Sequence, residues 1–225
     1  MSKHAFLSVL GFTVVALVLG IYLSSLSERE VSSTGFPWQI ENMESGHTRV
    51  FNLVIGQSTL NDAEQLYKER AKITLFSSSE SDAVIEAFFS QLKIAGLKSK
   101  MVISFDLPAD EIQAIYNRGA RIATLDSGIR QVTLLDEDAE LVRQSAIASI
   151  TYLPAIHLDA ELIEKRFGQP AEKIQDTESD AVHWLYPNKG VDIALSETEK
   201  EVIQYVLPKD FDDLVKPLKA VVNKD

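Results

Sequence analysis

The hydrophobic pattern of the chain begins with an uninterrupted apolar run, AFLSVLGFTVVALVLGIYL, over residues 5–23. The run contains no charged residue, and about 20 apolar residues are needed to cross a bilayer as a helix. Lys3 precedes the run, and positive charge stays on the cytoplasmic side of a membrane. The pattern therefore predicts a cytoplasmic tail at residues 1–4, a transmembrane anchor at residues 5–26 and a periplasmic C-terminal domain.

A cleaved signal peptide is the alternative interpretation of this run. The apolar core of a signal peptide is about 7–15 residues long, and this run is longer. Ser25-Leu26-Ser27 offers a small-x-small cleavage site. We favour the uncleaved anchor, which makes the chain a single-pass protein of the cell inner membrane. A juxtamembrane linker is then expected at residues 27–48.

The linker carries two aromatic residues, Phe36 and Trp38. Aromatic rings are favoured at the headgroup level of a membrane, so both are candidates for contact with the membrane interface. The alternative is that they fold onto the domain that follows.

Beyond the linker, similar short sequence segments occur in both halves of the chain. VISFDLPAD at residues 102–110 matches VIQYVLPKD at residues 202–210, and ESDAV occurs at both 80–84 and 178–182. A shorter match, Asp-Ala-Glu, lies further upstream in both places. Collinear matches at a nearly constant offset predict an internal duplication.

Each half shows the same expected order of elements: a short strand, a helix, and then three apolar runs separated by turns. The expected runs are 83–89, 92–95 and 101–105 in the first half, and 181–186, 191–195 and 202–206 in the second. Short connections favour antiparallel pairing. The predicted fold is α+β, with an N-terminal transmembrane helix followed by two duplicated helix-plus-antiparallel-meander units, at residues 49–119 and 149–225.

Residues 120–148 are expected to connect the two units. A hairpin should turn at Asp126-Ser127-Gly128, and a short helix should follow at residues 136–145. At the end of the chain, apolar residues at helical spacing predict a helix in which Pro217 causes a kink or an early break.

The second half combines RFGQP at residues 166–170 with HWLY at residues 183–186 and two further strand patterns. This combination resembles the SmpA/OmlA (BamE-like) family of small envelope proteins, whose fold is a helical pair against a three-stranded antiparallel sheet. The tandem layout resembles the β-lactamase-inhibitor-protein architecture. Family members are typically lipoproteins anchored through a cysteine. This chain has no cysteine, which argues for the inner rather than the outer membrane.

Composition and motifs exclude several kinds of chemistry. The net charge of −11 disfavours nucleic acid as a partner, because phosphates and the protein repel one another. None of the four histidines stands in a metal-ligand pair, and the acidic run at residues 136–140 lacks the glycine of a calcium loop. No nucleophile or phosphate-loop motif occurs. We therefore predict no catalytic residue, no cofactor and no metal, and hence no enzyme.

The leading functional hypothesis is a membrane-anchored periplasmic protein-binding module. It would be an accessory or scaffold subunit of an inner-membrane or envelope complex, and its partner would be another envelope or inner-membrane protein. The alternative is an inhibitor or regulator of a periplasmic enzyme. Trp184 is expected to pack in the core against the helix that contains Leu162 and Phe167. In the alternative, Trp184 and Tyr186 form an exposed anchor for the partner, a role in which tryptophan is enriched.

Overall fold

The computed structural model of the chain describes residues 35–79, 82–126, 128–177 and 179–222. The expected tail at 1–4, the expected anchor at 5–26 and residues 27–34 of the expected linker lie outside the described residues. Within the described ranges, no helix is both long and apolar enough to cross a bilayer.

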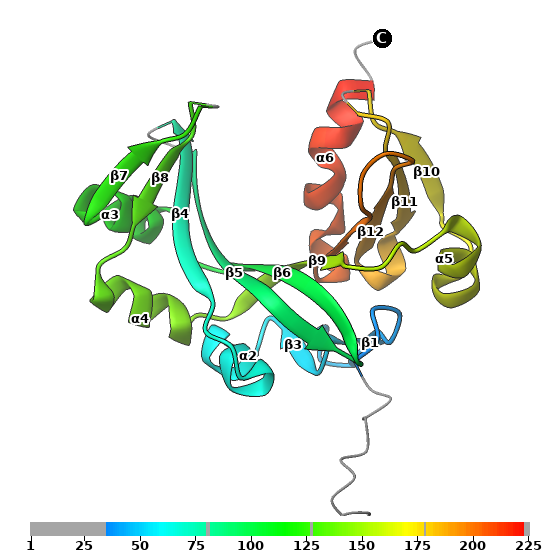
Figure 1. Cartoon of the computed structure of the whole chain (residues 1–225), viewed down its shortest axis with the longest axis horizontal. Coiled ribbons are helices and arrows are strands. Elements are labelled where there is room, and N and C mark those ends of the chain that lie inside the picture. The colour runs from blue at the N-terminus through cyan, green and yellow to red at the C-terminus, as the bar shows by residue number, and fades with distance from the viewer. Residues whose placement is uncertain (1–34, 80–81, 127, 178, 223–225) are drawn as a thin grey trace, which may run out of the picture. The chain divides into compact units, whose positions relative to one another are not determined.

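A ten-stranded antiparallel sheet forms the framework of the described residues, in the order β10-β11-β12-β13-β9-β6-β5-β4-β8-β7 (Figure 1). Its strands are, in chain order, β4 (Lys72–Ser79), β5 (Asp82–Ile94), β6 (Leu97–Phe105), β7 (Arg121–Thr124), β8 (Arg130–Thr133), β9 (Ile147–Pro154), β10 (Glu172–Gln175), β11 (Val182–Tyr186), β12 (Val191–Leu195) and β13 (Val202–Tyr205). A separate three-stranded sheet contains β1 (Glu41–Asn42), β2 (Thr48–Val50) and β3 (Leu53–Ile55).

The predicted fold of two separate helix-plus-meander units is wrong. Strand β9 pairs on one side with β6, through Met101 opposite Tyr152, and on the other side with β13, through Ile203 opposite Tyr152. The strands of both halves therefore belong to one continuous sheet. The sequence pattern missed this because it predicted pairing only between strands of the same half, whereas β9 joins strands of both.

The predicted internal repeat is not supported either. The two runs expected at 83–89 and 92–95 form one strand, β5, with an irregularity between Phe89 and Leu92, and β4 was not expected. Four strands, β10 to β13, follow the helix of the second half. Leu207 is 8% exposed, whereas Leu107 is only partly buried, so the two leucines are not equivalent. Glu80, Ser81 and Glu178 of the ESDAV match lie outside the described residues.

Other local predictions are confirmed. Strands β7 and β8 form the expected hairpin, and a helix follows it directly. The strands expected at 181–186, 191–195 and 202–206 appear as β11, β12 and β13. The helix expected near the end of the chain is present as well, but it runs through Pro217 to Val222, so the predicted early break at Pro217 is wrong.

The helices begin and end where local chemistry favours it. They are α2 (Leu60–Tyr67), α3 (Ala109–Arg118), α4 (Asp136–Gln144), α5 (Ala160–Phe167) and α6 (Phe211–Val222), with short 3-10 turns η1 (Pro187–Lys189) and η2 (Pro208–Asp210). Thr59 and Asp62 form a capping box at the start of α2. Asp159 caps α5, and Gly168 with a φ of 83° follows its last residue.

Alternation along the strands gives the large sheet two faces. One of them, here called the core face, carries buried side chains from strands of both halves of the chain, including Leu75, Ile103, Tyr152 and Ile203. The small sheet covers its middle, where Phe51 packs on Tyr152 with ring centroids 4.8 Å apart. Buried residues of α2, α3, α4 and α5 join the same hydrophobic cluster.

The opposite face of the sheet, here called the second face, is covered at one end by α6. Phe211 and Val215 of this helix form a separate hydrophobic cluster with Ile174, Leu185 and Val206. The sheet is therefore sandwiched between α5 and α6 at the β10–β13 end. The second face of the remaining strands positions the candidate site.

Candidate protein-binding surface

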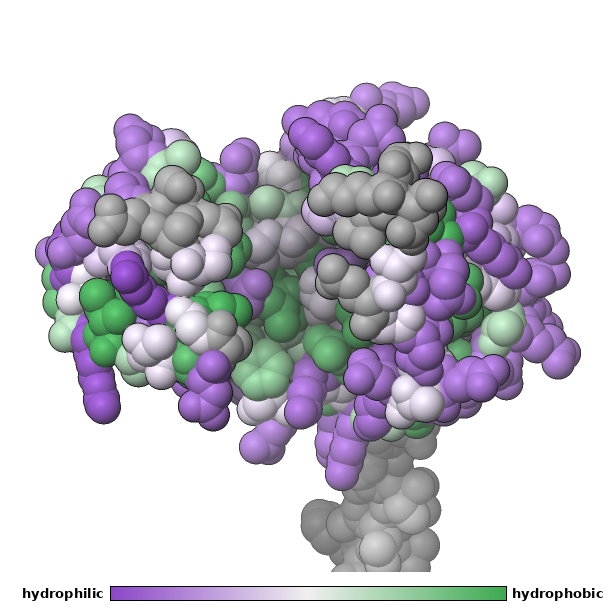
Figure 2. Space-filling model, turned by 90° about the horizontal axis from the view of Figure 1, so that it is seen from above, coloured by the Kyte–Doolittle hydropathy of each residue, from purple (hydrophilic) through white to green (hydrophobic). Residues whose placement is uncertain are grey.

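An apolar surface lies on the second face where α6 does not reach. Its members, here called the open surface, come from β4, β5, β6 and β9 and are Thr74, Phe76, Val84, Glu86, Phe88, Val102 and Thr151. Their apolar members belong to neither hydrophobic cluster, and Val84 is 42% exposed. Figure 2 looks down on the molecule and shows a hollow with an apolar floor and polar rims. Phe76, Phe88 and Val102 are half-buried and Thr74 is buried, so the described residues cover the strip only in part.

A shallow pocket of about 220 Å³ marks the β4–β5 part of the open surface. Phe76, Phe88 and the carboxyl group of Glu86 line it. Partial burial raises the pKa of Glu86. Lys72, opposite Phe88 on β4, lines the same pocket, but Glu86 forms no ion pair with it or with any other described residue.

The strand register places polar groups on both sides of the apolar centre. Phe88 lies opposite Val102, and Glu86 lies opposite Ser104. Lys100 precedes Val102 by two residues on β6 and therefore lies on the same face of the strand. Because alternate residues of a strand are about 7 Å apart, a carboxylate and an ammonium group flank the Phe88–Val102 pair.

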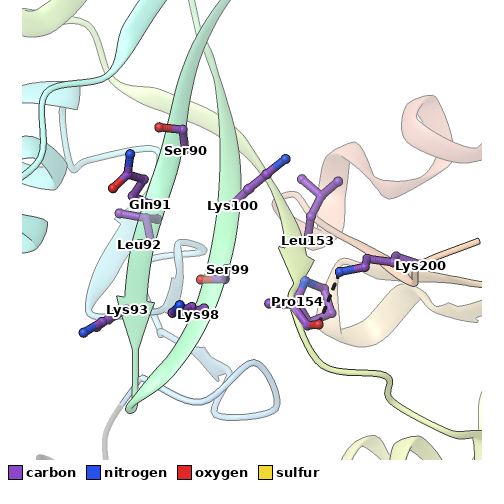
Figure 3. Close-up of a pocket in the computed structure, with 11 residues that line it drawn as sticks. Ser90, Gln91, Leu92, Lys93, Lys98, Ser99, Lys100, Leu153, Pro154 and Lys200 are labelled. Carbon is purple, nitrogen blue, oxygen red and sulfur yellow. Dashed lines mark hydrogen bonds between the residues drawn. The ribbon is translucent and has the colours of Figure 1, made fainter.

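A second hollow of about 530 Å³ continues the surface beyond Lys100 and is here called the lysine pocket. Four lysines line it, Lys93, Lys98, Lys100 and Lys200, and no carboxylate is among its lining residues. Figure 3 shows Lys100 and Lys200 pointing toward β9 from its two sides, where Leu153 and Pro154 form an apolar wall, while Lys93 points away. Lys200 donates to the carbonyl of Ala155. None of the four forms an ion pair with the described residues, so the pocket offers free positive charge in an acidic protein.

The aromatic residues expected at the membrane interface lie on the folded domain. Phe36 stacks on Trp38, with ring centroids 4.9 Å apart and planes 7° from parallel. Trp38 packs against the main hydrophobic cluster, and the guanidinium carbon of Arg166 lies 4.8 Å above its ring. These contacts hold both side chains within the described domain.

The residues considered as a partner-binding anchor are buried. Trp184 is 6% exposed and Tyr186 is 4% exposed, and both join the cluster that contains Phe167. The Tyr186 hydroxyl donates to the carbonyl of Gly168 at 3.0 Å. The HWLY and RFGQP segments thus meet in space, with Tyr186 fastening the end of α5 to the sheet.

The acidic and histidine residues singled out in the sequence have structural partners. Asp138 in the acidic run is buried at the start of α4 and accepts hydrogen bonds from Arg118 at 2.8 Å and 3.1 Å. His183 lies on the second face, and its Nδ1 is 2.8 Å from Oδ2 of the buried Asp192. Within the described ranges, no group of three or more ligand-type side chains is placed to hold a metal ion.

The open surface and the lysine pocket were not predicted from the sequence. One signal was available: residues 83–89 are apolar at nearly every position, which indicates a strand with two apolar faces rather than one. The four lysines gave no such signal, because Lys200 comes from the other half of the chain.

Comparison of the chain with family models, with curated proteins and with solved structures finds no match in any of the three. The resemblance to the SmpA/OmlA family therefore stays a prediction. The open surface and the lysine pocket are therefore the features from which a function can be inferred.

Proposed function

We propose that the chain binds another protein with the open surface and the adjoining lysine pocket. The observation that carries this proposal is the half-buried Phe76–Phe88–Val102 strip, which belongs to neither hydrophobic cluster although it lies on the sheet whose other face forms the main one. A contiguous exposed apolar patch rimmed by polar residues is typical of a protein-interaction site. The apolar strip supplies burial, and the flanking charges supply orientation.

The charges define the chemistry of the partner segment. In an extended segment of the partner, side chains on one face are also about 7 Å apart. An apolar side chain placed on Phe88 and Val102 then sets a basic neighbour near Glu86 and an acidic neighbour near Lys100. Further carboxylates of the partner would meet the remaining lysines of the lysine pocket. The occupant we propose is therefore a protein segment with one apolar residue between a basic and an acidic one.

The cellular location of this interaction is inferred from the sequence alone. Residues 5–26 would attach the protein to the inner membrane, with the described domain in the periplasm, so that it acts as an accessory or scaffold subunit of an envelope complex. Attachment raises the effective concentration of the domain near other membrane proteins. If the partner proves to be an enzyme that binding inhibits, the protein is a regulator instead.

Site-specific crosslinking in living cells tests the surface. A photoreactive phenylalanine analogue at position 88 should yield a discrete adduct with one partner protein. The same analogue at Ile122, which is 51% exposed in the β7–β8 hairpin, should not yield this adduct. Lys100→Glu should reduce the adduct at position 88 at least about tenfold, because it replaces an attraction with a repulsion.

Lys165→Glu is the matched control, since Lys165 is an exposed lysine on α5 and the change in net charge is the same. Equal loss of the adduct in both lysine variants would point to net charge alone. Equal adducts from positions 88 and 122 would contradict a defined surface.

Fractionation tests the attachment to the membrane. The protein should stay in the membrane fraction after a carbonate wash, because an apolar span is held by burial rather than by charge. A C-terminal alkaline phosphatase fusion should be active if the domain is periplasmic. Release of a mature protein that begins near Glu28 would instead identify residues 5–23 as part of a cleaved signal.

A further inference from the structure

A third pocket, of about 710 Å³, lies on the core-face side of the sheet near the start of α5. It is separate from the open surface. Its apolar lining includes Leu158, Trp184 and Leu195. The indole of Trp184 already receives one cation, since Nζ of Lys173 lies 3.5 Å from the centre of its ring. The pocket is here called the Glu201 pocket.

Glu201 is the unusual member of this lining. It is completely buried, and its Oε1 contacts Nδ1 of His157. Apart from this contact, neither carboxylate oxygen has a partner among the described residues. A buried carboxylate is ordinarily satisfied by several donors, because desolvating it without them is costly.

Of the three other acidic residues that line the pocket, Glu197 is exposed to solvent and two are hydrogen-bonded. Asp159 accepts from the backbone N–H of Leu162 at the start of α5. Asp180 accepts from the hydroxyls of Ser196 and Thr198, which lowers the pKa of Asp180. Glu201 is therefore the buried lining carboxylate with unused acceptor capacity.

His157 covers Glu201 and is only loosely held. Its side chain is 69% exposed and lies in the segment between β9 and α5. Apart from Glu201, no described residue forms a hydrogen bond or ion pair with the imidazole. An imidazole held by one contact at the surface can swing aside and give access to the carboxylate.

We propose that the Glu201 pocket binds a small organic cation. Its ammonium group replaces His157 at Glu201, and its apolar body lies against Trp184, Leu158 and Leu195. The ammonium supplies the donors that the carboxylate lacks, and a charge-assisted hydrogen bond of this kind is among the stronger ones. The aromatic wall suits a ligand whose charge is attached to a ring or chain.

Titration of tryptophan fluorescence tests the proposal on the full-length chain. The sequence contains two tryptophans, so Trp38→Phe leaves Trp184 as the single reporter in the pocket. The probes are phenethylamine, which is protonated at neutral pH, and its neutral counterpart phenethyl alcohol. We expect saturable quenching by the amine and at least about tenfold weaker binding of the alcohol, since a hydrogen bond to a charged group is stronger than one to a neutral group.

Three variants test which residues determine the binding of the amine. Glu201→Gln should weaken amine binding at least about tenfold. Glu44→Gln, which removes the same charge from an exposed turn, should leave it within about twofold. His157→Ala should tighten amine binding, because it removes the group that competes for Glu201.

The opposite results would overturn the proposal. Equal binding of the amine and the alcohol would show that charge is not recognised. Equal effects of the two glutamate variants would reduce the attraction to net charge, and weaker binding after His157→Ala would make the imidazole part of the site rather than its cover. Should Glu201→Gln fail to fold, the amine–alcohol comparison and His157→Ala still decide the matter.

Discussion

At the scale of single residues, the described domain contains buried carboxylates that each contact a single partner side chain. Asp192 is 3% exposed on β12, and its Oδ1 has no hydrogen-bond partner among the described residues. Its Oδ2 lies 2.8 Å from Nδ1 of His183. The hydrogen bond to Asp192 raises the pKa of His183, and the charges of Asp192 and Asp176 add to the effect.

This pair predicts a pH dependence of stability near neutrality. Because the pKa of His183 is higher in the folded state than its ordinary 6.5, its contribution to the free energy of unfolding is complete below pH 6.5 and is lost as the pH rises through the folded value. Denaturant unfolding between pH 5 and 9 should show this decline. Asp192→Asn should flatten it, whereas Asp126→Asn in an exposed turn should not. A slope that survives Asp192→Asn would assign the dependence to another group.

At the scale of elements, α6 is the helix that decides how much of the second face stays open. It covers β10–β13 through Phe211 and Val215, and it continues past Pro217. Proline cannot donate the backbone hydrogen bond to the carbonyl of Asp213, four residues earlier, and its ring disfavours the preceding turn. Pro217 itself is exposed, so its ring adds little packing.

Pro217→Ala should therefore stabilise the protein. Restoring the hydrogen bond and the helix propensity outweighs the entropy regained by the unfolded chain, for a net gain of about 1–2 kcal/mol. Denaturant unfolding measures the change, and Lys216→Ala at the neighbouring exposed position is the control. A gain no larger than that of the control would mean that the helix tolerates the proline at no cost.

At the scale of the whole domain, β9 makes one cooperative unit of the two halves of the sheet. It pairs with β6 through seven residue pairs and with β13 on its other edge. The Ser104 and Ser149 hydroxyls also bond across the β6–β9 pair at 2.6 Å. The hydrophobic cluster of the core face runs through both halves without interruption.

A destabilising mutation in the first half should therefore also lower the stability of the second half. Leu75 on β4 is completely buried, so Leu75→Ala should cost about 2–5 kcal/mol. In the Trp38→Phe background, the fluorescence of Trp184 on β11 should report the full shift of the unfolding midpoint. Val84→Ala on the open surface, where the side chain is 42% exposed, should lower the free energy of unfolding by about 0.5 kcal/mol or less. An unshifted Trp184 transition in Leu75→Ala would mean that the halves unfold independently.

The sequence by itself determined the local elements of this protein. Asp159, Gly168 and Pro170 set the limits of α5, the Asp126–Gly128 turn set the β7–β8 hairpin, and apolar alternation set β11, β12 and β13. Each of these depends on residues a few positions apart, whose propensities and hydrogen bonds act within one element. The absence of cysteine and the net negative charge likewise follow from composition.

Only the tertiary structure decided which strands meet and which surface stays open. Long-range pairing of β9 with β6 and β13 is the sum of many weak contacts, none of which leaves a mark in a short stretch of sequence. The same pairing merges two expected units into one sheet and brings Lys200 beside Lys100. It also buries Glu201 beneath His157, two residues that no local pattern connects.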